Sequence, residues 1–188
     1  MDVSIVDIAE SNTYKLCAAR TLVAAFADRE RSAWPDIESA AEEVEECAEG
    51  ASLCIGAYDG RTMLGWVGLR EMYKVTWELH PLAVDPRHQG KGIGSLLLRE
   101  LEARAARRGI IGVMLGTDDE EFGTSLSAID LDGGNVLREA ERIRNLKRHP
   151  YEFYLKNGYA IVGVVPNANG KRKPDIWMWK SLLNDREG

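Results

Sequence analysis

Residues 89–94, Gln-Gly-Lys-Gly-Ile-Gly, place glycines at alternate positions between an apolar run, 79–84, and an amphipathic stretch, 95–108. Glycines let the backbone turn tightly and approach a ligand closely. A helix that starts beside them directs unpaired N–H groups and the positive end of its dipole at the same point. The segment therefore predicts a binding site for a phosphate or diphosphate group.

Two well-known phosphate loops do not fit this segment. A Walker loop requires Ser or Thr directly after Gly-Lys, whereas Lys91 is followed by Gly92. A dinucleotide-binding loop has its last two glycines three residues apart and follows the first strand of a βαβ unit, whereas this segment lies mid-chain. On spacing alone, a glycine-rich helix start without a ligand remains an equal alternative.

The order Gln-x-x-Gly-x-Gly, formed by Gln89, Gly92 and Gly94 with Arg87 just ahead, resembles the coenzyme A diphosphate loop of the GNAT superfamily of N-acetyltransferases. The resemblance implies acetyl-CoA as co-substrate. We expect no metal, because His80, His88 and His149 lack the spacing of a metal site. The resemblance also implies a set of coenzyme-contacting residues on the loop, the preceding strand and a later tyrosine: Leu82, Val84, Gln89, Gly90, Lys91, Gly92, Ile93, Gly94, Ser95 and Tyr154.

Six further stretches, in the same order along the chain, resemble the aminoglycoside 6′-N-acetyltransferases. They are residues 77–82, 115–119, 123–127, 149–154, 166–170 and 173–178. The resemblance implies transfer of an acetyl group to the 6′-amino group of an aminoglycoside, which would give antibiotic resistance. Residues before about 53 resemble this subgroup less clearly, and that part of the family helps to cover the acceptor.

Acetyl transfer from a thioester requires a neutral amine, and a general base that removes the amine proton can contribute about 100- to 10,000-fold. Glu78 and His80 are two residues apart on an expected strand and therefore share a face. We expect Glu78 to act as the base through water, with His80 supporting it or contacting the acceptor. The alternatives are a surface carboxylate for Glu78 and a packed, hydrogen-bonded side chain for His80.

The resemblance assigns two further catalytic roles. The backbone N–H of Leu82 would polarise the thioester carbonyl. Pro81, just before it, predicts a bulge or an edge in the strand, and a bulge would free N–H groups from sheet pairing. Tyr154 would protonate the departing thiolate, and core packing is the alternative for this side chain.

Aminoglycosides carry several ammonium groups, and a carboxylate at contact distance offers each about 1 kcal/mol in water and up to about 4 kcal/mol near a protein surface, before desolvation. Asp118 and Asp119 follow an apolar strand-like run and are the best candidates, with Glu42 or Glu43 on an acidic helix. Trp34 or Trp77 could stack on a sugar, although buried packing fits both. The predicted acceptor-binding set is Trp34, Glu78, His80, Asp118, Asp119 and Asp175.

The order of expected elements is a strand, two helices, three strands, a helix, a strand, a helix and a closing strand pair. It predicts an α/β fold with a mixed central sheet of six to seven strands and helices on both faces. The GNAT fold has this order. With 188 residues, the chain fits a single domain over residues 1–188.

The net charge of −6 argues against a nucleic-acid partner and is compatible with a polycationic one. No apolar stretch reaches membrane-spanning length, so we expect no membrane partner and a cytoplasmic location. We expect the three cysteines to be reduced thiols. The resemblance makes a homodimer possible.

Two other functions remain open at this point. A polyamine or protein N-acetyltransferase would use the same coenzyme and the same acidic residues. A non-catalytic acyl-CoA-binding module would need neither Glu78 nor Tyr154 as a proton carrier.

Overall fold

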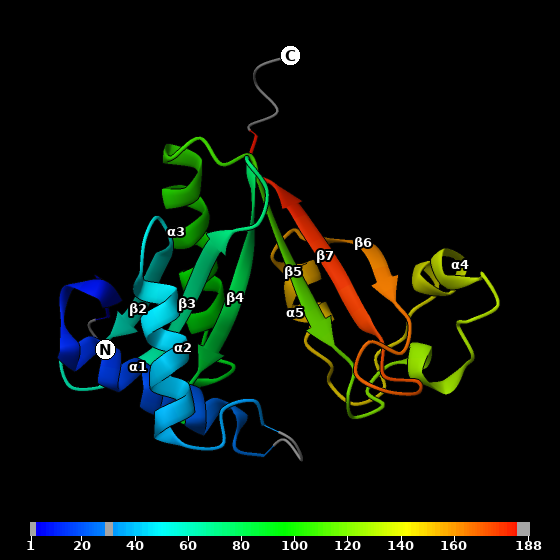
Figure 1. Cartoon of the computed structure of the whole chain (residues 1–188), viewed down its shortest axis with the longest axis horizontal. Helices are drawn as coiled ribbons and strands as arrows, with labels where there is room; N and C mark the ends of the chain where they lie inside the picture. The colour runs from blue at the N-terminus through cyan, green and yellow to red at the C-terminus, as the bar shows by residue number, and fades with distance from the viewer. Residues whose placement is uncertain (1–2, 29–31, 184–188) are drawn as a thin grey trace. The chain divides into compact units, whose positions relative to one another are not determined.

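The computed structural model describes residues 3–28 and 32–183, which divide into two compact units (Figure 1). The first unit contains Met1–Ile111 and Leu182–Gly188, and the second contains Gly112–Ser181. The single domain expected over the whole chain stays a prediction.

The sheet of the first unit contains four strands in sequence order: β1 (Ser4–Asp7), β2 (Leu53–Tyr58), β3 (Met63–Glu71) and β4 (Thr76–Val84). Each strand is antiparallel to the next. Asp59 stabilises the turn between β2 and β3, because its carboxylate accepts hydrogen bonds from the N–H groups of Arg61 and Thr62 at 2.9 and 2.8 Å.

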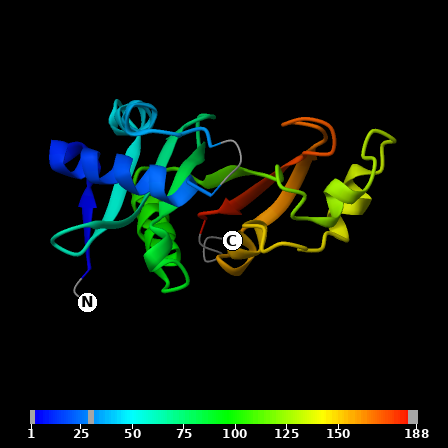
Figure 2. The same cartoon turned by 90° about the horizontal axis from the view of Figure 1, so that it is seen from below.

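Helices lie on both faces of this sheet. Helices α1 (Asn12–Phe26) and α2 (Ile37–Ala48) lie on one face, and α3 (Ile93–Arg107) lies on the other, as Figure 2 shows from below. On α2, Ala40, Val44 and Cys47 are buried at the spacing of one helical face. They join Trp66 of β3 and Ala83 of β4 in the main apolar core of this unit.

A bulge interrupts the pairing of β3 with β4, as Pro81 predicts. Val67 pairs with Leu82 and Leu69 pairs with Leu79, so Gly68 alone lies opposite His80 and Pro81. Gly68 is required here because a Cβ at this position would overlap Cys47 Sγ and the His80 carbonyl oxygen. The side of β3 that carries Gly68 therefore faces α2.

This bulge turns two parts of β4 toward opposite faces of the sheet. Glu78 pairs with Arg70 and Leu82 pairs with Val67, and directly paired residues share a face. Arg70 and Val67 are three residues apart on β3 and so face opposite sides. Glu78 therefore lies on the α2 side and Leu82 on the α3 side, although an unbroken strand would put both on one face.

Within the second unit, the strands pair antiparallel in the order β5 (Gly112–Asp118), β7 (Asp175–Ser181), β6 (Ala160–Val165). Its helices are α4 (Val136–Glu141), which the sequence pattern did not predict, and α5 (Tyr151–Lys156). The described residues of both units thus hold seven strands, and the predicted α/β fold class is confirmed.

Three 3₁₀ turns complete the elements: η1 (Ile8–Glu10), η2 (Pro86–His88) and η3 (Ser125–Ala128). The three cysteines are free thiols. Among the helices of residues 3–28 and 32–183, none is both long and apolar enough to cross a membrane.

Replacing Gly68 with Ala should destabilise the first unit, because the added methyl group would overlap α2 and the β4 backbone at once. Overpacking of this kind costs about 1–3 kcal/mol, which corresponds to a fall of about 2–12 °C in melting temperature for a chain of this size. The matched control is Gly163→Ala on β6, where a Cβ would meet no atom within 4 Å. Equal melting temperatures for the two variants would contradict this account of the bulge.

Candidate functional site

The start of α3 is open to an anion. Its N-cap is Gly92, no side chain caps the helix there, and its first turn holds no acidic residue. By contrast, α1 and α2 are capped by the side chains of Ser11 and Asp36. The first N–H groups of a helix have no partner within the helix, so those of α3 are donors for a ligand.

The two glycines before α3 have both the conformation and the space that a diphosphate site requires. Gly90 and Gly92 have φ values of +71° and +83°, a region that side chains rarely adopt. A Cβ on either residue would meet no atom within 4 Å. The residues present therefore fit the predicted coenzyme diphosphate, which would contact the backbone directly.

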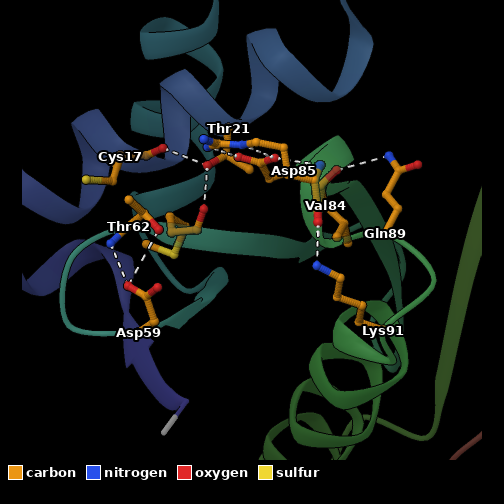
Figure 3. A network of polar contacts seen from close by, with 10 residues as sticks. Cys17, Thr21, Asp59, Thr62, Val84, Asp85, Gln89 and Lys91 are labelled. Carbon is orange, nitrogen blue, oxygen red and sulfur yellow. Dashed lines mark hydrogen bonds and ion pairs between the residues drawn. The ribbon is translucent and has the colours of Figure 1, made fainter. Parts of the chain in front are cut away.

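Side chains of the loop form hydrogen bonds within the loop and hold its backbone in place (Figure 3). Buried Asp85 accepts hydrogen bonds from the backbone N–H and the guanidinium of Arg87, and this contact holds the pKa of Asp85 below its ordinary value. Gln89 Nε2 donates to the Val84 carbonyl at 3.1 Å, and Lys91 Nζ donates to the Arg87 carbonyl at 2.7 Å. Among the loop side chains predicted to bind the coenzyme, Gln89 and Lys91 thus support the loop itself.

The residues on the α3 side of β4 lead into this loop. Val84 pairs with Gly65, and a Cβ on Gly65 would touch the Cγ2 atoms of both Val84 and Ile93. Ile93 is buried, so its backbone N–H rather than its side chain is the group available to a ligand. Gly94 and Ser95 follow it in the first turn of α3.

Glu78 lies on the α2 side with a permanent cation beside it. Its Oε2 atom is 2.7 Å from Arg70 Nε, and both side chains remain partly exposed. The ion pair joins the two residues that face each other across β3 and β4. It fixes the orientation of the carboxylate that the sequence predicts as the base.

His80 is held by three groups of the first unit. Its Nε2 atom is 3.5 Å from Glu43 Oε1, its ring centroid is 5.9 Å from that of Trp34, and its carbonyl accepts a hydrogen bond from Cys47 Sγ at 3.2 Å. Trp34 is fixed in turn by an edge-to-face contact with Phe26 at 4.9 Å. The structure thus brings together the predicted residues Trp34, Glu43 and His80.

The second unit places Asp118 and Asp175 directly opposite each other on β5 and β7. The Asp175 carboxylate accepts a hydrogen bond from Trp177 Nε1 at 2.7 Å. It also lies directly over Gly116, where an added Cβ would come within 2.7–2.8 Å of the carboxylate oxygens. Asp118 is exposed and is hydrogen-bonded by Asn169 Nδ2. Like charges opposite each other are unfavourable, so a cation beside this pair would be stabilising.

Asp119 has a different role from the one predicted. It is 1% exposed, and its carboxylate accepts hydrogen bonds from the N–H groups of Gly123 and Thr124 and from the hydroxyls of Thr124 and Ser127. Burial raises its pKa, but these hydrogen bonds outweigh burial and lower it below the ordinary value. Since donors of its own loop occupy the carboxylate, Asp119 organises residues 119–127 and does not present a charge to an acceptor.

Tyr154 lies in an aromatic cluster of the second unit. Its ring makes edge-to-face contacts with Phe153 and Tyr159, at centroid distances of 5.1 and 5.7 Å, and it is 8% exposed. The packing alternative therefore describes part of its environment, and its role as an acid stays a prediction.

The sequence pattern missed the partners that orient the predicted residues. Arg70 is one such partner. The sequence could have indicated it, because Arg70 lies on the strand that forms a hairpin with the strand of Glu78. The sequence pattern could not indicate the contact between Cys47 and Gly68, because it depends on how α2 packs on the bulge. Within the described part of the chain, no group of three or more His, Cys, Asp or Glu side chains could hold a metal ion.

The model of the acetyltransferase (GNAT) family matches residues 20–124 of the chain. A crystal structure of an aminoglycoside 6′-N-acetyltransferase in complex with coenzyme A is 38% identical, with a TM-score of 0.87 and 100% of both chains covered. The structure of the aminoglycoside 6′-N-acetyltransferase from Enterococcus faecium is 39% identical, again with a TM-score of 0.87 and full coverage of both chains.

A shorter similarity links the chain to a protein-modifying enzyme. The N-alpha-acetyltransferase RimI of Mycobacterium tuberculosis is 38% identical over 69 residues, which cover 35% of this chain and 43% of RimI. The match thus spans less than half the length of that curated relative.

Replacing Asp119 with Asn should lower stability most at neutral pH. Because its pKa is lower in the folded state, Asp119 stabilises the fold above its unfolded pKa of about 3.9, and this contribution is lost as the pH falls through the folded value. At pH 7 the variant should lose about 1.5–3 kcal/mol, the range for a hydrogen bond to a charged group.

Thermal unfolding between pH 7 and pH 3 measures both the loss of stability at neutral pH and its decrease at lower pH. The difference between wild type and Asp119→Asn should shrink as the pH falls, whereas Glu121→Gln, at an exposed position in the same loop, should follow the wild type throughout. A gap between wild type and Asp119→Asn that stays constant over this range would exclude an ionised Asp119 as its source.

Proposed function

Because the chain belongs to the acetyltransferase (GNAT) family, we propose that it transfers the acetyl group of acetyl-CoA to the 6′-amino group of an aminoglycoside. The observation that carries the proposal is the full-length similarity, at 38–39% identity, to two aminoglycoside 6′-N-acetyltransferases. Antibiotic resistance, a cytoplasmic location and a homodimer belong to the same proposal as expectations from the sequence.

The first step is binding of the acetyl-CoA diphosphate by the amides at the start of α3. The positive end of the helix dipole and the uncapped N–H groups favour an anion at this point. Gly90 and Gly92 supply the left-handed backbone and the free space that direct contact with the backbone requires. The thioester arm would then follow β4, where the resemblance assigns the N–H of Leu82 to the acetyl carbonyl.

The chemical step is direct attack of the amine on the thioester. The acceptor arrives as an ammonium ion and loses its first proton to Glu78 through water. The neutral amine then forms the C–N bond as the C–S bond breaks, its nitrogen releases a second proton to water, and the departing thiolate takes one proton from Tyr154. Arg70 holds the Glu78 carboxylate in one orientation at 2.7 Å, and His80 lies two residues away on the same side of β4. A polarising donor such as Leu82 N–H is worth about 3–4 kcal/mol in enzymes where one has been removed.

Two roles rest on the resemblance for residues of the second unit. Tyr154 would protonate the departing thiolate, and the carboxylates of Asp118 and Asp175 would bind ammonium groups of the acceptor. The direct opposition of these two carboxylates on β5 and β7 supports the second role.

One observation favours a second acceptor class. The 69-residue similarity to RimI, named as an N-alpha-acetyltransferase, makes a protein N-terminus a candidate acceptor. That similarity covers 35% of the chain, whereas the similarity to the aminoglycoside enzymes covers all of it, so the antibiotic remains the first choice.

Thiol release from acetyl-CoA should be measured with kanamycin- or tobramycin-like acceptors beside a peptide with a free N-terminus and a polyamine. We expect the aminoglycosides to react with the highest kcat/KM. An otherwise matched aminoglycoside with a hydroxyl in place of the 6′-amine should release no thiol, because no nucleophilic amine occupies the reacting position. Faster release with the peptide, or equal release with the hydroxyl compound, would reject the proposed acceptor or the proposed position.

A further inference from the structure

Two carboxylates, those of Glu78 and Glu43, contact residues on the α2 side of β3 and β4, and their partners differ in chemistry. Glu78 pairs with the guanidinium of Arg70, which carries a permanent charge. Glu43 instead reaches the ring of His80, which is a cation only when protonated. The Glu43 side chain is 15% exposed, so its charge is held close to the protein interior.

Helix α2 places the Glu43 carboxylate 3.5 Å from His80 Nε2 on β4. Val44 and Cys47 on the same helix are buried against the sheet, and Cys47 Sγ donates to the His80 carbonyl. This contact fixes the His80 backbone relative to α2. The bulge at Gly68 allows it, since any side chain at Gly68 would overlap Cys47.

The environment of Glu43 keeps it ionised. The contact with His80 lowers the pKa of Glu43 most, and Trp34 and Arg70 lower it further, against the opposing effect of burial. A carboxylate anion can only accept hydrogen bonds, so the 3.5 Å contact favours the form of the His80 ring that carries its proton on Nε2. In a neutral imidazole, this leaves the lone pair on Nδ1.

We propose that Glu43 is a positioning residue for acetyl transfer that acts through His80. It holds Nε2–H against α2, so that Nδ1 is the atom that accepts a hydrogen bond from the acceptor amine. Trp34 limits rotation of the ring from one side, at a centroid distance of 5.9 Å. His80 thereby aligns the amine while Glu78 takes the proton, and this inference rests on the proposed acetyltransferase function.

A double-mutant cycle tests whether Glu43 acts through His80. The four proteins are wild type, Glu43→Gln, His80→Phe and the double variant, compared by kcat/KM for the acceptor at saturating acetyl-CoA. Glu43→Gln should lower kcat/KM by about 3- to 100-fold, the range of coupling between residues in contact. In the His80→Phe background, the same substitution should change kcat/KM by less than about two-fold, because the residue it acts on is gone.

Three controls separate positioning from loss of structure. Glu46→Gln removes the same charge from an exposed position on α2 and should keep wild-type kcat/KM. The dissociation constant for acetyl-CoA should be unchanged in every variant, because the start of α3 is intact. If Glu43→Gln folds poorly, Glu43→Asp keeps the charge, shortens the reach and should show the same dependence on His80.

Equal factors for Glu43→Gln in the two backgrounds, or an unchanged kcat/KM in the wild-type background, would overturn the proposal. The cycle uses whichever primary amine the wild type acetylates fastest. Rejection of aminoglycosides would therefore refute the proposed acceptor while the cycle still tests the role of Glu43.

Discussion

The contact of α2 with the β3–β4 bulge is the constraint on which the candidate site depends. Gly68 opposes two residues of β4, and its missing side chain leaves room for Cys47 to reach the His80 carbonyl. The bulge also changes which residues of β4 face α2. Glu78 and His80 therefore meet Arg70 and Glu43, while Leu82 and Val84 lie on the side that leads to α3.

This arrangement gives the two ends of β4 different chemistry. At one end, paired carboxylates and a histidine are suited to binding and deprotonating an amine. At the other, the strand runs through the loop of Asp85 and Gln89 into a helix whose first amides have no cap. One unit can thus recognise two ligands of opposite charge. The start of the helix favours the anionic diphosphate of the acyl donor, and the carboxylates favour the cationic acceptor.

The sequence predicted what depends on local chemistry. The alternating glycines indicated a tight turn before α3, and Pro81 indicated a bulge or an edge, of which the structure forms the bulge. The fold class and most of the order of elements along the chain followed from the pattern of apolar runs and breakers. The acidic helix is α2, which begins at Ile37 because the side chain of Asp36 caps it.

The sequence could not predict what depends on packing between distant segments. Asp118 and Asp119 are neighbours with the same side chain, yet one is exposed and the other is enclosed by Thr124 and Ser127. Similarly, Glu42 and Glu43 could not be distinguished until α2 was placed on the sheet, where Glu43 contacts His80. These distinctions arise from burial and partner choice, which a linear pattern does not encode.

The central claim is that the amides at the start of α3 bind the acetyl-CoA diphosphate, and calorimetry on two Gly92 variants tests it most directly. Asn and Asp tolerate positive φ better than other side chains and differ here mainly in charge. The account predicts that Gly92→Asp binds acetyl-CoA at least about ten-fold more weakly than Gly92→Asn, because a carboxylate at this point would cap the amides and repel the diphosphate. Equal dissociation constants for the two variants would contradict it.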